Sequence, residues 1–169
     1  IAYLIGRLSW FTYLTSVATL IPAIIFTISL SLFFALIMVL TRRTVIKLNS
    51  WYSIFAFPVF LTTFELLLIH FSPDGTATSI AYSQLNFLPI IQIASVTGIL
   101  GITFLVSFIP SAVAIGWYYR KEKNSIRTIG SISVVVILAV FIFFIVRLNN
   151  ASQIDSVKVG LTVLEEKFH

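Results

Sequence analysis

The chain has 169 residues, of which 59% are hydrophobic and only 10% are charged, and its formal net charge is +5. A small soluble domain keeps too much of its surface in water to bury so many apolar residues, so this composition excludes a soluble globular protein. It indicates an all-α integral membrane protein. The absence of cysteine excludes disulfides, thiolate metal ligands and a thiol nucleophile within these residues.

Four segments reach the roughly 20 apolar residues that a helix needs to cross a bilayer. A fifth, at the N-terminus, is interrupted by Arg7 and Ser9, so we predict a helical bundle with four full spans and one partial span. The predicted full spans are 20–40, 51–71, 99–119 and 129–146, and the partial span is 1–19. Together they make residues 1–147 a transmembrane domain. Because apolar character begins at Ile1, we expect the segment to belong to a longer chain.

Seven of the eleven Lys and Arg residues fall in two short segments, "TRRTVIKLNS" (41–50) and "RKEKNSIR" (120–127). The positive-inside rule places both segments on the cytoplasmic side of the membrane. Residues 72–88 and the tail 148–169 then face outward. Since topology accounts for most of the positive charge, and no basic groove alternates with stacking aromatics, we predict no nucleic-acid partner.

Glu65 is an acidic residue inside the 51–71 span, six residues from its outer end. At 1.5 Å per residue this places it roughly 9 Å deep. A charged carboxylate that faced lipid there would cost about 3 kcal/mol, so we predict that Glu65 faces the bundle interior near the outer loop. It would either hold that loop in place or contact a substrate directly.

The stretch "AYSQLNFLPIIQIAS", residues 81–95, gathers amides and hydroxyls in a chain that otherwise avoids polar residues. Irregular backbone at membrane depth is tolerated only where it is buried against protein or lines a wet cavity. With Glu65, the following side chains are therefore candidates to line or support a lipid-accessible cavity: Tyr82, Ser83, Gln84 and Gln92. The alternative is an interfacial loop whose polar side chains touch lipid head groups.

The stretch "ASVTGILG" places Ala94, Gly98 and Gly101 at helical spacing. Small residues spaced in this way let helix backbones approach closely in membranes, so we predict that the three serve helix packing. No cluster of His, Asp and Glu has metal-ligand spacing, and no Gly-rich loop meets a helix start. We therefore predict no metal and no cofactor in this chain.

The segment "AYSQLNFLPIIQIASVTGILGITFLVSF", preceded by Glu65 in "TTFELLL", resembles the membrane region of bacterial apolipoprotein N-acyltransferases, which belong to the carbon-nitrogen hydrolase (nitrilase) superfamily. The shared features are a Tyr-Ser-Gln, a Gln-x-Ala, and a G-x-x-G followed by Ser/Thr-Phe-Leu. Upstream, "RLSWFTYLTSVA" resembles the family's outer stretch after its third helix. The tail "DSVKVGLTV" resembles the first strand of the hydrolase domain, so the resemblance implies that 148–169 is an outward-facing linker and first strand of a truncated nitrilase-like domain.

The resemblance implies a two-step acyl transfer in the bacterial inner membrane, with the tail on the periplasmic side. The family moves an acyl chain from a phospholipid to a cysteine thiolate, and then to the N-terminal cysteine amine of a lipoprotein, with a Glu as base and a Lys at the oxyanion. Those groups belong to the hydrolase domain, so the resemblance implies that this chain contains no catalytic residue. This chain is then expected to be the membrane platform, with membrane lipids and that missing domain as partners. The coding sequence beyond His169 should supply the three catalytic groups.

Two alternatives stay open. The chain has no Arg shortly after Glu65, and its turn "DGTATSIA" lacks the family's Pro and Trp, so a relative that acts on another acyl acceptor is one of them. The other is a transporter subunit or a structural or assembly protein, which would use Glu65 and the outer amides as a polar relay. Two observations disfavour a transporter: one membrane carboxylate is a weak basis for coupling transport to ion movement, and the sequence shows no inverted repeat of broken helices.

Overall fold

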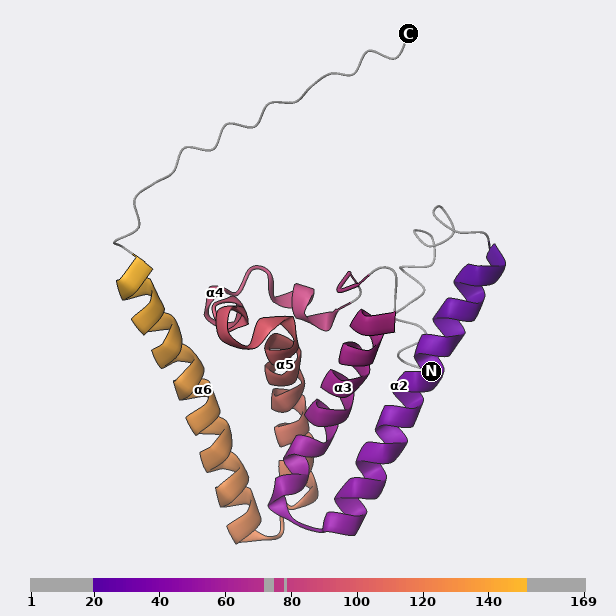
Figure 1. Ribbon diagram of the computed structural model, residues 1–169. Helices are drawn as coiled ribbons and strands as arrows, with labels where there is room; N and C mark the ends of the chain where they lie inside the picture. Colours follow the sequence, from indigo (N-terminus) through magenta and orange to yellow (C-terminus); the bar gives the residue numbers. More distant parts are fainter. Residues whose placement is uncertain (1–19, 72–74, 78, 152–169) are drawn as a thin grey trace.

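The computed structural model describes residues 20–71, 75–77 and 79–151 (Figure 1). Its elements, in chain order, are α2 (Leu20–Leu48), η1 (Trp51–Phe55), α3 (Ala56–Phe71), η2 (Ile80–Gln84), α4 (Leu88–Ile91), α5 (Ala94–Tyr118) and α6 (Lys123–Ala151). Every regular element among the described residues is helical, which confirms the predicted all-α bundle. The predicted partial span 1–19 and the predicted strand in the tail lie outside the described residues.

Within the described residues, four stretches of helix are long and apolar enough to cross a membrane: Ile24–Leu48, Trp51–Phe71, Ala94–Tyr118 and Lys123–Asn149. Each corresponds to one of the four predicted full spans. Three of the helices extend beyond the predicted bounds, because a helix satisfies its own backbone hydrogen bonds and need not end where the hydrocarbon ends. Most of the two basic segments, 41–50 and 120–127, lies between the predicted spans but belongs to the end of α2 and the start of α6.

The second span begins with the 3-10 turn η1 and continues as α3. The Ser53 hydroxyl donates a 2.7 Å hydrogen bond to the Ser50 carbonyl and so closes the first turn. Pro58 lies in the first turn of α3, where its missing N–H needs no partner. The chain thus enters this span without losing a helical hydrogen bond.

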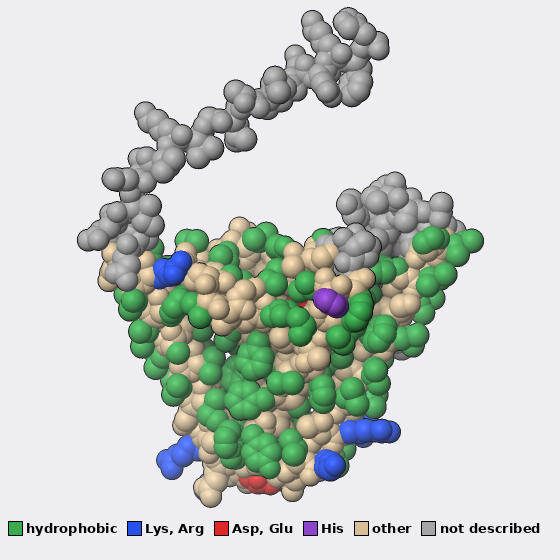
Figure 2. Space-filling model, viewed as in Figure 1, with side chains coloured by type: hydrophobic (Ala, Val, Ile, Leu, Met, Phe, Trp, Pro, Cys, Tyr) green, Lys and Arg blue, Asp and Glu red, His purple; other side chains and the backbone are tan. Residues whose placement is uncertain are grey.

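α3 and α5 form the most extensive helix contact, while α2 packs on α3 and α6 packs on α5. Figure 1 shows α6 leaning away from α5 toward the end that carries η2 and α4. We call it the loop end. The opposite end is called the basic end after its seven cations, Arg42, Arg43, Lys47, Arg120, Lys121, Lys123 and Arg127. Figure 2 shows basic side chains along that lower end.

The largest buried cluster joins α2, η1, α5 and α6, and it consists of Val45, Ile54, Phe108, Ala112, Ile115, Tyr119 and Ile129. A smaller cluster at the loop end joins Ala81, Ile90 and Ile102. The outer faces of the helices are also apolar, as the hydrophobic side chains in the middle of Figure 2 show. Large exposed residues such as Leu32 and Val113 would form an aggregating patch in water, but they suit contact with lipid.

Candidate functional site

The Glu65 carboxyl group lies inside the bundle, where only 6% of the residue is exposed. Its Oε2 accepts hydrogen bonds from the Ser79 hydroxyl at 3.0 Å and from the Thr103 hydroxyl at 2.5 Å. Its Oε1 accepts from the backbone N–H of Ile80 at 2.7 Å. Three donors from two other parts of the chain therefore surround one acidic side chain of α3.

These donors place Glu65 at the start of η2. The first N–H groups of a helix have no partner within the helix, and a side-chain oxygen nearby can accept from them. Ser79 is the N-cap of η2, and its hydroxyl oxygen accepts from the Ala81 N–H at 3.2 Å. Glu65 accepts from the Ile80 N–H, so the two residues together satisfy the start of η2 and tie the loop to α3.

One face of α5 carries hydroxyl groups at four-residue spacing, at Thr103, Ser107 and Ser111, and all three residues are buried. The Ser107 hydroxyl donates to the Thr103 carbonyl at 2.7 Å, and the Ser111 hydroxyl donates to the Ile54 carbonyl at 2.6 Å. Hydroxyls that bond backbone carbonyls are small and leave no polar group unpaired, so two helices can pack closely across them. This face fixes α5 against η1 and α3.

The other polar residues predicted near Glu65 bond within the loop. The Tyr82 hydroxyl shares a 2.9 Å hydrogen bond with the Thr76 hydroxyl. The Ser83 hydroxyl donates to the Ile80 carbonyl at 2.7 Å, and the Gln84 amide donates to Ser83 Oγ at 3.1 Å. Among the described residues no hydrogen bond joins these three side chains to Glu65. Tyr82 and Ser83 are exposed, whereas the buried Glu65 accepts from the first N–H of η2 on its interior side.

Gln92 lies apart from that group and interacts with α6. Its Oε1 accepts a hydrogen bond from Arg147 Nε at 3.3 Å. Gln92 directly precedes Ile93, and Arg147 lies one turn beyond Phe143; both Ile93 and Phe143 line an apolar groove between α5 and α6. The Gln92–Arg147 hydrogen bond is therefore located where this groove reaches the loop end.

The groove has a volume of about 460 Å³. Val96, Phe104 and Leu105 line one wall, and residues of α6, among them Val136, Ala139 and Val140, line the other. A second apolar cavity of about 180 Å³ adjoins it and shares Leu105, Val136 and Val140 with it. Sequence reasoning left two possibilities for the polar residues of 81–95: they line or support a lipid-accessible cavity, or they form an interfacial loop. The groove beside that stretch is lined almost wholly by apolar side chains.

Ala94, Gly98 and Gly101 do not share one packing face in the structure. Gly98 has φ 68° and ψ −169°, a non-helical conformation that kinks α5, and a Cβ atom at Gly98 would meet nothing within 4 Å. A Cβ atom at Gly101 would collide with the Thr97 side chain of the same segment. Ala94 packs against the small cluster at the loop end. The kink removes the helical phase that relates Ala94 to the two glycines.

The sequence model of the apolipoprotein N-acyltransferase N-terminal domain matches residues 1–112. The chain belongs to this family. Glu65 and all of its donors lie within the matched residues, whereas Arg147 and the whole of α6 lie beyond them. No curated protein and no solved structure matches the chain. The family supports the membrane character that the four apolar helices indicate.

Sequence reasoning missed several residues that form these contacts, namely Ser79, Thr103, Ser107, Ser111 and Arg147. One signal was present for three of them, because hydroxyl residues at 103, 107 and 111 recur every four positions in an otherwise apolar span. Ser79 and Arg147 carry no such signal, since their contacts depend on how distant segments meet. The described residues contain no group of three His, Cys, Asp or Glu side chains that could hold a metal ion.

Proposed function

We propose that this chain is the membrane platform of an apolipoprotein N-acyltransferase, an enzyme that transfers an acyl chain from a phospholipid to the N-terminal cysteine amine of lipoproteins. The family match over residues 1–112 is the observation that carries this proposal. The hydrogen-bonded Glu65 supports it, because a loop held rigidly at one membrane surface is suited to support a catalytic domain above it.

The chemistry requires groups that these 169 residues do not contain. The reaction passes through a thioester on a cysteine, and the sequence has no cysteine. The nucleophile, the base and the oxyanion-stabilising lysine would come from a nitrilase-like domain connected through residues 148–169. In this arrangement the described helices bind lipid and orient that domain.

The seven cations of the basic end favour an orientation with that end in the cytoplasm of a bacterial cell and the loop end in the periplasm. Glu65 and η2 would then lie at the outer leaflet, on the same side as the tail. Donor phospholipid and lipoprotein acceptor would both be reached from that leaflet.

The groove between α5 and α6 is our candidate site for an acyl chain of the donor lipid. Its lining is almost wholly apolar, and it lies between two membrane-spanning helices that lean apart toward the loop end (Figure 1). Arg147, at that end of the groove, would lie near the lipid phosphate, which a guanidinium binds well. An apolar groove with a cation at its end is complementary to a phospholipid, which has an apolar chain and a negatively charged phosphate.

Acylation of a diacylglyceryl-cysteine peptide by the purified full-length protein tests the proposed activity, with phospholipid as the acyl donor. We expect N-acylated peptide and a thioester intermediate that hydroxylamine releases. Purified residues 1–169 should form neither. Acyl transfer by residues 1–169 alone, or no transfer by the full-length protein, would overturn the proposal.

Filling the groove tests its proposed occupant. Ala139→Phe adds a ring to the groove wall, whereas Val134→Phe, the matched control, adds one at an exposed position of α6 outside the groove. We expect Ala139→Phe to raise the KM for phospholipid while Val134→Phe leaves it unchanged. Equal KM values in the two variants would exclude the groove as the acyl-chain site.

Family membership favours the acyltransferase over the transporter reading. The hydrogen bonds of Glu65 argue in the same direction, because both carboxyl oxygens accept from fixed donors of the loop and of α5. A relay group must exchange partners during transport, and a group held by three donors is suited to a structural role instead.

A further inference from the structure

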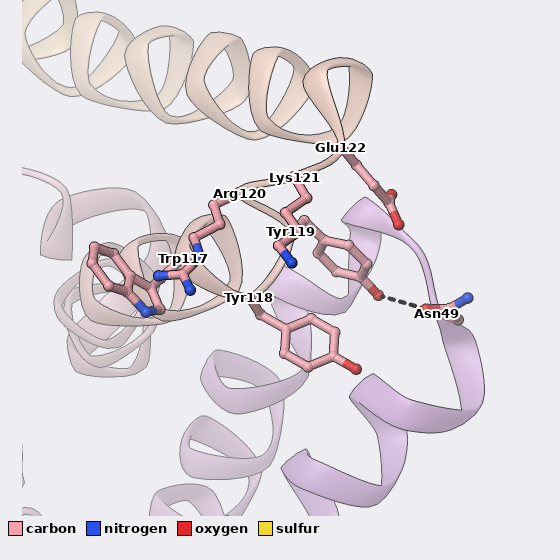
Figure 3. Close-up of a pocket in the computed structure, with 7 residues that line it drawn as sticks. All are labelled: Asn49, Trp117, Tyr118, Tyr119, Arg120, Lys121 and Glu122. Carbon is pink, nitrogen blue, oxygen red and sulfur yellow. Dashed lines mark hydrogen bonds between the residues drawn. The ribbon is translucent and has the colours of Figure 1, made fainter.

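A second candidate binding site lies at the basic end, where the structure has an open pocket of about 470 Å³. It lies between the turn that joins α5 to α6 and the residue after α2, Asn49 (Figure 3). Figure 3 shows the aromatic side chains of Trp117 and Tyr118 together with the two cations Arg120 and Lys121 around this pocket. The pocket is therefore lined by both aromatic rings and positively charged side chains.

Hydrogen bonds hold the wall of this pocket in place. Tyr119 is only 3% exposed, and its hydroxyl donates to Asn49 Oδ1 at 3.4 Å, which ties the end of α5 to the end of α2. The Glu122 N–H donates to the Tyr119 carbonyl at 2.8 Å and closes a tight turn around Arg120 and Lys121. A phenol is protonated at neutral pH and can donate, and burial raises the pKa of Tyr119 further above its usual value.

Among the described residues the two cations of the pocket form no ion pair, although Glu122 also lines the pocket. The Arg120 guanidinium lies 4.9 Å from the centre of the Trp117 ring, a cation–π contact that orients it. In the described part of the chain none of the seven cations of the basic end forms an ion pair. Glu122 is the one described acid there, and its carboxylate accepts from the Ser125 hydroxyl at 3.0 Å at the start of α6, where the helix dipole favours negative charge. Arg120 and Lys121 thus remain available to an external anion.

The pocket lies at the depth of lipid head groups. Trp117 and Tyr118 are 70% and 58% exposed in the last turn of a membrane-spanning helix. Amphipathic aromatic rings prefer the head-group level of a bilayer, which places the adjacent cations beside lipid phosphates. A soluble anion would gain nothing from the exposed rings, whereas a lipid would cover them with its glycerol and upper acyl region.

We propose that this pocket binds the head group of an anionic phospholipid, whose phosphodiester oxygens contact Arg120 and Lys121 while Trp117 and Tyr118 pack against its glycerol region. The site lies at the opposite end of the bundle from Glu65 and goes beyond the proposed acyl transfer. Binding there fixes the α5–α6 turn to one leaflet and holds the two helices that form the groove.

Native mass spectrometry of the full-length protein in detergent tests this site, with phosphatidylglycerol and phosphatidylcholine as probes. We expect tighter binding of phosphatidylglycerol, weakened about tenfold by the double variant Arg120→Gln/Lys121→Gln, because charge-assisted hydrogen bonds contribute on this scale. The matched control Arg42→Gln/Arg43→Gln removes the same charge from the same end and should retain most of the affinity. If the double variant does not fold, Lys121→Gln alone serves as the test. It keeps the Arg120–Trp117 contact and should lose part of the affinity.

Three outcomes would overturn the proposal. Equal losses in the two double variants would mean that diffuse positive charge, and not the pocket, attracts the lipid. Equal affinity for phosphatidylcholine would mean that the head-group charge is not recognised. Displacement of phosphatidylglycerol by an equal concentration of soluble glycerol phosphate would identify a site for free phosphate esters instead of a lipid site.

Discussion

The Thr103 hydroxyl of α5 donates a 2.5 Å hydrogen bond to Oε2 of Glu65 on α3, at a point where Thr103 is 0% and Glu65 is 6% exposed. This bond joins the two central spans of the bundle through buried polar groups. The same carboxyl group accepts from Ser79 and from the Ile80 N–H. The packing of α3 on α5 and the position of η2 therefore depend on one side chain.

Thr103→Val keeps the shape of the side chain and removes its donor. Because Glu65 Oε2 would lose its shortest bond while it stays buried, we expect a loss of about 1 to 3 kcal/mol in unfolding free energy, measured in detergent by denaturant titration. Thr97→Val is the control, since the Thr97 hydroxyl is exposed and bonds the Ile93 carbonyl of its own segment. A control as unstable as Thr103→Val would show that the Glu65 contact contributes nothing particular.

Two substitutions at Glu65 distinguish the effect of side-chain shape from the effect of charge. Glu65→Gln keeps the length of the side chain and one acceptor oxygen, whereas Glu65→Leu leaves three donors without a partner. In the full-length protein we expect Glu65→Leu to lose most of its acyl-transfer activity and Glu65→Gln to lose less, with the helices inserted in both. Comparable losses would point to the charge. Unchanged activity and stability in both variants would mean that Glu65 neither supports the loop nor serves the site.

Gly98 and Gly130 form a matched pair for alanine substitution, because a Cβ atom has open space at both positions. Gly98 has a φ of 68°, in a region that is almost restricted to glycine, so Gly98→Ala should cost about 1 to 3 kcal/mol in unfolding free energy. Gly130 lies within α6, where alanine is favoured by about 0.5 to 1 kcal/mol. Stability measurements that rank the two variants in the reverse order would contradict the kink at Gly98.

The proposed orientation predicts which cysteines an impermeant maleimide can reach in intact cells. Leu85→Cys lies in the loop after η2, with 63% exposure in the wild-type residue, and should be labelled from outside. Lys123→Cys, at the start of α6, should be labelled only after the cells are lysed. Strong labelling of position 123 in intact cells would reverse the topology.

The four full spans and their order could be predicted from the sequence, because burial in lipid depends on the local apolar length of the chain. The interior position of Glu65 also followed from a local argument, the cost of a carboxylate facing lipid. The helix ends could not be predicted in this way, because hydropathy reports only on the part of a helix that lies in hydrocarbon. α6 accordingly begins at Lys123, six residues before the predicted 129.

The partners of Glu65 could not be predicted, because they depend on the rotation and register of α5 and on the path of the loop. Thr103 is 38 residues away from Glu65 in the chain, and Ser79 is 14 away. The Gly98 pattern was misleading for a related reason: the spacing of small residues suggests close packing, but it carries no information about φ. Polar residues within 81–95 were visible as a group, yet only the folded chain separates Gln92, which meets Arg147, from Tyr82, which bonds within the loop.

The uneven charge of the two ends also has an electrical consequence. Seven cations and Glu122 at the basic end carry a net charge of six, since 7 − 1 = 6. A charge that crosses a membrane potential of about 100 mV changes in energy by about 2.3 kcal/mol, so in the proposed orientation a negative cell interior would favour this end by about 14 kcal/mol over the inverted arrangement. An energised membrane would thus hold the bundle in place during synthesis, when few helices are yet packed.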